Sequence, residues 1–123
     1  MNTNQRPLTR KYWKSIGGTL IEEYCAVKGE AGSAPRYIDG IIILSGPKKI
    51  IQGGSPTVKG KNIIVIQTET GRVGMYLLGQ ALFSRELMKR FKPKSIRTIA
   101  LCNKNDIVLE KIAKKYSVQI ITL

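Results

Sequence analysis

The stretch that decides the fold is Lys61-Asn-Ile-Ile-Val-Ile-Gln-Thr-Glu69. It is a continuous run of β-branched apolar residues that ends in polar ones, which predicts a strand buried on both faces. Side chains alternate along a strand, so Gln67 and Glu69 share one face at its carboxyl end. The sequence therefore predicts a central strand that places two polar side chains at one edge of a sheet.

The segments on either side of this strand predict an α/β fold. Apolar residues at helical spacing and a cap at Asn105 or Asp106 predict three helices, over 11–27, 72–91 and 107–115. Extended runs between turn residues predict the other strands, over 36–44, 48–52, 95–102 and 116–123. The order is αβββαβαβ. We expect a mixed β-sheet flanked by helices, parallel where helices separate the strands and antiparallel where strands follow one another.

Length and composition predict a single domain behind a short arm. A chain of 123 residues with 42% hydrophobic content supports one core and is short for two. Residues 1–10 are polar and contain Pro7, so we expect them to form a flexible arm and residues 11–123 to form the domain. Inside the first predicted helix, Gly17-Gly18 weakens the helix locally and allows another backbone to approach closely.

The charge of the chain predicts a polyanionic partner. Lys and Arg number 21 against 8 Asp and Glu, a formal net charge of +13, and a basic surface gains affinity for phosphates through counterion release. Nucleic acid is the first candidate; the alternative is that the charge reflects a Lys- and Ile-rich proteome. Neither a membrane span nor a signal-type segment is present in the sequence, so we expect an intracellular, cytoplasmic protein without a membrane partner.

The absence of histidine excludes several chemistries. Ser-His-Asp and Cys-His mechanisms are ruled out, and Cys25 and Cys102 alone are too few for a zinc site. These cysteines lie within apolar patterns, which predicts small core residues. Gly53-Gly-Ser-Pro56 lacks the Lys-Ser/Thr pair and the following helix of a phosphate-binding loop.

Four acidic residues occupy positions that need an explanation: Glu22, Glu23, Asp39 and Glu69. A carboxylate inside an apolar strand, such as Asp39, is costly unless it is hydrogen-bonded, paired or bound to a cation. The alternative for Asp39 is a structural hydrogen bond to a neighbouring strand or to Arg36. On the predicted first helix Glu23 is in phase with the apolar stripe and Glu22 points away from it. We therefore expect Glu23 to support a site and Glu22 to be a solvated surface acid.

Two short motifs point to a family. Pro35-Arg-Tyr-Ile-Asp39-Gly and Val65-Ile-Gln67-Thr-Glu69-Thr, in this order of elements, resemble the PD-(D/E)XK nuclease superfamily, and the final β-α-β segment is similar to that of its archaeal resolvase-like members. The resemblance implies a restriction-endonuclease-like core and Mg²⁺- or Mn²⁺-dependent cleavage of nucleic acid, DNA in preference to RNA. It further implies that Asp39, Gln67 and Glu69 are catalytic residues that bind the metal, with Glu23 as a catalytic residue in support.

The chain departs from the family pattern at two of these positions. Gln67 stands where the family has a carboxylate, and Glu69 stands where it usually has lysine. An amide oxygen can ligate a cation but brings no charge. The alternative is therefore a catalytically inactive nucleic-acid-binding or scaffold module that retains the nuclease fold.

Residues that would contact nucleic acid come from three segments. Arg72, Tyr76 and Gln80 recur every four residues and are expected on one face of the second long helix. The alternative is that Tyr76 belongs to the core and Gln80 caps a buried polar group. Basic residues at the start of the strand predicted over 48–52 and at the start of the central strand complete the predicted interface, Lys48, Lys49, Lys59 and Lys61. A homodimer through the second long helix or an edge strand is a further expectation.

Overall fold

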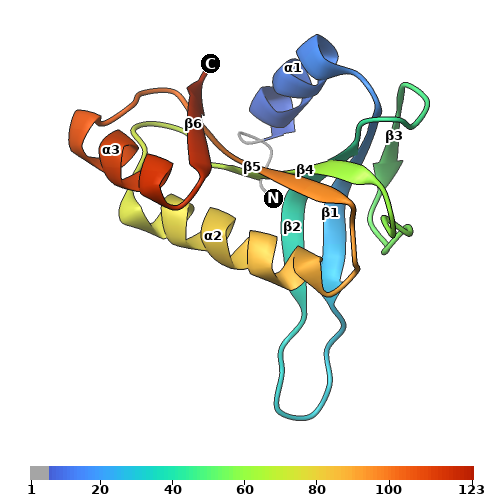
Figure 1. The fold of residues 1–123 in the computed structure, drawn as a ribbon. Helices are drawn as coiled ribbons and strands as arrows, with labels where there is room; N and C mark the ends of the chain where they lie inside the picture. The colour runs from blue at the N-terminus through green and yellow to red at the C-terminus, as the bar shows by residue number, and fades with distance from the viewer. Residues whose placement is uncertain (1–5) are drawn as a thin grey trace.

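The computed structural model describes residues 6–123, which form one mixed six-stranded sheet with helices on both of its faces (Figure 1). The helices are α1 (Arg6–Ile16), α2 (Met75–Lys89) and α3 (Ile107–Lys115). The strands are β1 (Thr19–Val27), β2 (Arg36–Ile43), β3 (Lys49–Gln52), β4 (Asn62–Thr68), β5 (Ser95–Cys102) and β6 (Val118–Thr122). Their spatial order is β3-β1-β2-β4-β5-β6. The predicted mixed sheet flanked by helices is confirmed.

The order of elements differs from the prediction because residues 19–27 form a strand. The helix predicted over 11–27 is wrong in its second half: α1 ends at Ile16, and Gly17 and Gly18 both have positive φ, 88° and 77°. β1 then pairs antiparallel with β2 and parallel with β3, so both of its edges are hydrogen-bonded. The observed order is αββββαβαβ.

The Gly17-Gly18 turn brings two backbones together, as expected from the sequence. A Cβ added at Gly18 would overlap the carbonyl oxygen of Ile43, and the indole nitrogen of Trp13 donates a hydrogen bond to the Gly18 carbonyl at 2.8 Å. This packing closes α1 onto the sheet. Residues 6–10, predicted as part of a flexible arm over 1–10, are helical and belong to α1; residues 1–5 lie outside the described part.

The core has two layers, one on each face of the sheet. Four consecutive residues of β4, Ile63 to Ile66, are completely buried and contribute alternately to the two layers. Tyr12 and Trp13 of α1 pack with Ile64 and Ile66 on one face, and Met88 of α2 packs with Ile63 and Val65 on the other. The central strand is thus buried on both faces, which confirms the prediction.

The carboxyl-terminal third follows the predicted pattern closely. β5 covers the predicted range, and the Asp106 side chain caps α3 by accepting hydrogen bonds from the backbone N–H groups of Val108 and Leu109. α2 buries Leu77, Ala81 and Met88. No helix within residues 6–123 combines the length and apolar character needed to cross a membrane.

The two cysteines are free and lie on strands. Cys102 on β5 is buried, which confirms its prediction as a core residue, whereas Cys25 on β1 is only half-buried.

Candidate functional site

Two neighbouring irregularities in β1 and β2 determine where the acidic residues lie. Ile21 and Tyr24 belong to the same core layer although they are three residues apart, and so do Ile38 and Ile41. Regular alternation would put the members of each pair on opposite faces. The alternation therefore switches between them, at Glu23 in β1, whose φ is +54°, and near Asp39 in β2.

Glu23 and Asp39 lie opposite each other across the β1–β2 pair. The register joins Glu22 to Gly40 and Tyr24 to Ile38, and the two acids lie between these pairs. Both side chains are half-buried. The structure thus brings together two predicted site residues, although the element that carries Glu23 is a strand and not the predicted helix.

Asp39 occupies the point at which β2 separates from β4. The β2–β4 ladder ends at the Gly40–Ile66 pair, and beyond it an Asp39 carboxylate oxygen accepts a hydrogen bond from the Thr68 backbone N–H at 2.9 Å. A structural hydrogen bond from Asp39 to a neighbouring strand was one of the two alternatives drawn from the sequence, and this bond to β4 matches it. A carboxylate has about four acceptor sites, so the bond leaves capacity for a further ligand.

The environment of Asp39 disfavours its charge. Burial raises the pKa of the Asp39 carboxyl, the Thr68 N–H offsets part of the increase, and the negative charge of Glu23 adds to it. A cation beside the two carboxylates would compensate both the burial and the repulsion. Asp39 is thus chemically suited to hold one.

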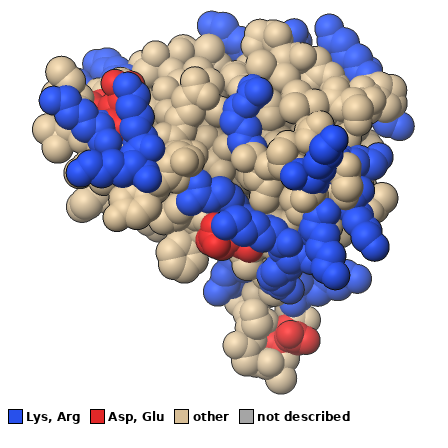
Figure 2. All heavy atoms as spheres, viewed as in Figure 1, with Lys and Arg blue, Asp and Glu red and all other residues tan. Residues whose placement is uncertain are grey.

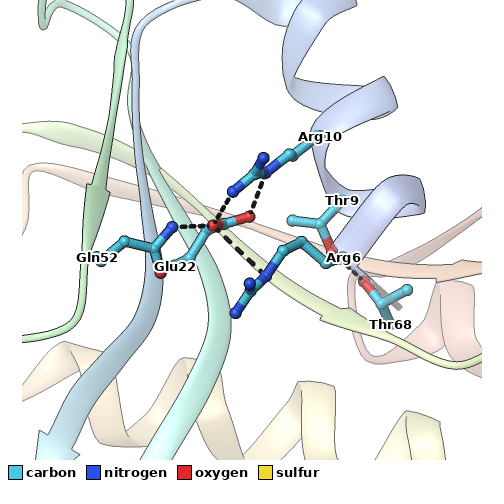
Figure 3. Close-up of polar contacts among 6 residues, drawn as sticks. All are labelled: Arg6, Thr9, Arg10, Glu22, Gln52 and Thr68. Atoms are coloured by element: carbon cyan, nitrogen blue, oxygen red, sulfur yellow. Dashed lines mark hydrogen bonds and ion pairs between the residues drawn. The ribbon is translucent and has the colours of Figure 1, made fainter. Parts of the chain in front are cut away.

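Glu22 is fully buried, which contradicts its prediction as a solvated surface acid. Its side chain has no exposed surface, and Arg10 of α1 donates two hydrogen bonds to it, at 2.8 and 3.0 Å (Figure 3). Arg6 lies 3.7 Å away, and Gln52 of β3 donates a further hydrogen bond. The reason for the error is the strand geometry, which turns Glu22 towards α1. Glu22 fastens both α1 and the edge strand β3 to β1.

Gln67 and Glu69 lie on either side of Thr68 at the end of β4, where the Thr68 N–H meets Asp39. The Gln67 side-chain amide is buried and donates a hydrogen bond to the Ser84 hydroxyl of α2 at 2.7 Å. Glu69 is half-buried, and its charge raises the pKa of Cys102, in addition to the larger effect of burial on that thiol. The negative charge of Glu23, across the β1–β2 pair, acts on Asp39.

Metal-binding groups of three or more Asp, Glu, His or Cys side chains are not found among residues 6–123. Asp39 and Glu23 nevertheless provide the oxygen donors that a hard divalent cation prefers. The roles predicted for Asp39, Gln67, Glu69 and Glu23 stay predictions.

The three residues predicted along one face of α2 are divided by the start of that helix. Arg72 precedes α2 and donates a hydrogen bond to the Asn105 carbonyl at 2.6 Å, so it supports the loop before α3. Tyr76 and Gln80 are both exposed on α2. The alternatives of a core Tyr76 and of a Gln80 that caps a buried group are therefore wrong.

The predicted lysines lie at the opposite end of the sheet from Asp39. Lys61 precedes β4, whereas Thr68 ends it, which separates the two by roughly 20 Å at about 3.3 Å per residue. Lys48 and Lys49 are at the same end as Lys61, because Lys49 pairs with Thr19 and Thr19 pairs with Ile43. These lysines are exposed or half-exposed, as is Lys59. The structure does not gather them around the acids.

A groove between the β1–β2 strands and α2 was not predicted. Its volume is 850 Å³, and it is lined by Tyr76 and Gln80 together with residues that were not predicted to contact a ligand, Arg36, Tyr37, Met75, Phe83 and Arg90. Apolar side chains at helical spacing are typical of a core, so their periodicity alone gave no sign that Met75 and Phe83 are exposed. We call this feature the aromatic groove.

Comparison of the chain with protein-family models, with curated proteins and with solved structures gave no match. Functional inference therefore starts from the geometry of the two acids and of the aromatic groove.

Proposed function

We propose that the chain is a metal-dependent nuclease that acts on nucleic acid, DNA in preference to RNA, and that its sheet is a variant of the restriction-endonuclease-like core. One observation carries the proposal. Asp39 and Glu23 face each other where β2 leaves β4, inside a chain with a net charge of +13. Paired acids within a basic protein suit a cation that meets a phosphate.

Each chain group has a defined part in this proposal. Asp39 and Glu23 would hold Mg²⁺ or Mn²⁺, with Glu69 on the adjoining end of β4 as a third carboxylate. The Thr68 N–H fixes the orientation of the Asp39 carboxylate through its 2.9 Å bond. A bound cation would supply charge neutralisation at the phosphate and a water of lowered pKa. Surface Lys and Arg would hold the polyanion.

A second candidate is nucleic-acid binding without cleavage. It is favoured by the hydrogen bond that ties the buried Gln67 amide to Ser84 of α2. Binding would then depend on salt and be indifferent to metal.

Cleavage of supercoiled plasmid and of single-stranded DNA, each with Mg²⁺ or Mn²⁺, separates these candidates. We expect Asp39→Asn to reduce the rate by about 100-fold or more, because the variant keeps an acceptor for Thr68 but loses the charge. Glu86→Gln, an exposed acid on α2, is the matched control and should cleave as the wild type does. Equal cleavage by wild type and Asp39→Asn would remove Asp39 from the mechanism. Cleavage that increases in Glu69→Lys would indicate a decayed site.

Thermal stability gives a readout that is independent of activity. At ten times its dissociation constant, Mn²⁺ should stabilise the wild type by about 1.4 kcal/mol and leave Asp39→Asn unchanged. Without metal, we expect Asp39→Asn to be more stable than the wild type at neutral pH. Because the folded pKa of Asp39 is raised, the wild type loses stability as pH rises through that pKa, and Asp39→Asn, which does not titrate, keeps it. A metal response that is equal in both proteins would contradict the proposed site.

A further inference from the structure

The aromatic groove exposes large side chains that a folded protein ordinarily buries. Tyr37 of β2 is 59% exposed, and Met75, Tyr76 and Phe83 of α2 are 79%, 76% and 72% exposed. Tyr76 and Phe83 are seven residues apart, so they project from one face of α2 about 10 Å apart. The β1–β2 strands and α2 form the two walls of the groove. Its floor is formed by Ile38, Gln67, Ser84 and Leu87.

Gly79 leaves a gap between the two aromatic rings of α2. A glycine inside a helix is unfavourable relative to alanine, and it is usually retained for close packing. Here an added Cβ would meet no atom within 4 Å, and Gly79 lines the groove. No neighbour within the fold requires this glycine. The gap between Tyr76 and Phe83 is therefore open to a flat ligand that approaches the helix backbone.

The groove is lined by two arginines and one carboxylate, Glu30, so its lining has a net positive charge. Arg36 and Arg90 line it, and neither forms an ion pair with another described residue. A second hollow shares Val27, Glu30 and Arg90 with the groove and adds Lys28, so the depression continues past the end of α2. Figure 2 shows Lys and Arg gathered over the C-terminal half of α2 and beside the β1–β2 hairpin.

These features together select an unpaired polyanion with flat groups. Aromatic rings and guanidinium groups stack on bases, and an exposed amide such as that of Gln80 can bond base edges. Duplex DNA keeps its bases stacked inside and offers the rings nothing to stack on. A second copy of this chain would bring a like charge of +13. We propose that the aromatic groove binds an unpaired stretch of nucleic acid, with bases on Tyr76, Phe83 and Tyr37 and phosphates at Arg36 and Arg90.

This inference rests on the proposed function in one respect, that nucleic acid is the partner. It adds the class of nucleic acid and the surface that selects it. Because base stacking does not need a divalent cation, the groove should bind single strands in the presence of a chelator.

The test is fluorescence anisotropy with labelled oligothymidylate and a duplex of equal length, both in chelator at fixed salt. Tyr76→Ala/Phe83→Ala should lower single-strand affinity by roughly 30-fold or more and leave duplex affinity within about twofold. Ile107→Ala/Tyr116→Ala is the matched control, since it removes two exposed apolar side chains of the α3 region outside the groove. This control should bind both ligands as the wild type does.

Gly79→Leu tests the gap without weakening the fold. Leucine favours the helix more than glycine does, and its Cβ would meet no atom within 4 Å, so the variant should melt at a higher temperature. Its single-strand affinity should nevertheless fall at least about tenfold, because the side chain fills the space between the rings.

Wild-type single-strand affinity in both groove variants would overturn the inference while leaving the proposed nuclease intact. Equal cleavage by wild type and Asp39→Asn, with single-strand binding by the groove retained, would overturn the proposed nuclease and leave this inference standing. Concentration-dependent dimerisation that the groove variants abolish would assign the groove to a second copy of the chain and overturn the inference. Sedimentation velocity measures that outcome directly.

Discussion

The Arg10–Glu22 pair should carry a large share of the stability of the fold. In Arg10→Ala, Glu22, which is fully buried in the wild type, loses the two hydrogen bonds of 2.8 and 3.0 Å from the guanidinium. Removing one partner of a buried ion pair ordinarily costs about 3–5 kcal/mol. We expect the lower end, about 3 kcal/mol, because Arg10 is partly exposed and Arg6 and Gln52 still contact the carboxylate. For a chain of this length the Tm falls by roughly 10 °C.

Heat and urea unfolding followed by circular dichroism measure this effect. Lys11→Ala is the matched control, because Lys11 is an exposed neighbour on the same helix and forms no ion pair within the described residues. It should change the free energy of unfolding by less than about 0.5 kcal/mol. If Arg10→Ala and Lys11→Ala unfold at the same temperature, the pair does not stabilise the fold and the reasoning from burial is refuted.

The pH dependence gives an independent check of the same pair. Burial alone would raise the pKa of Glu22, but hydrogen bonds from Arg10 and Gln52 and the charges of Arg10 and Arg6 lower it overall. A depressed carboxyl pKa contributes stability that is present above the ordinary pKa and lost as pH falls through the folded pKa. The stability difference between wild type and Arg10→Ala should therefore be largest near neutral pH and shrink in acid.

Two further substitutions test local geometry. Gly18→Ala should destabilise by about 3 kcal/mol or more, because its Cβ would overlap the Ile43 carbonyl oxygen at a positive φ, whereas Gly17→Ala shares the positive φ but has open space and should cost about 1–2 kcal/mol; urea unfolding of both distinguishes the clash from the φ term. Asp106→Ala should cost about 1 kcal/mol through loss of the α3 cap, and unchanged stability would show that the cap contributes nothing.

The acidic site was only partly predictable. Asp39 stands out in the sequence because a carboxylate within an apolar strand is costly. In the structure it lies where the β2–β4 ladder ends, and there its carboxylate accepts a hydrogen bond from the Thr68 backbone N–H. Glu22 was predicted in the wrong environment and Glu23 on the wrong element, because the residues that face the core of a strand depend on its partners. The switch of faces at Glu23 exists only when β1 lies beside β2.

The aromatic groove shows a different limit of sequence reasoning. Met75, Tyr76 and Phe83 have the apolar character of core residues, and no local pattern distinguishes a buried stripe from an exposed one. The exposure of these side chains depends on what packs against α2. The sheet packs against one side of α2 and leaves the other side open.

What the sequence by itself determined is the set of segments whose periodicity is local and strong. β4, β5, α2 and α3 follow from runs of β-branched residues, apolar stripes and the Asp106 cap, signals that lie within a few residues of each other. Whether residues 19–27 form a helix or a strand depends on the tertiary structure. Their apolar spacing fits a helix, but a strand there gains hydrogen bonds from β2 and β3 along both edges, and those partners lie 9 to 30 residues away along the chain. The same pairing buries Glu22 and sets Glu23 beside Asp39, so non-local hydrogen bonding determined both the edge of the fold and the candidate site.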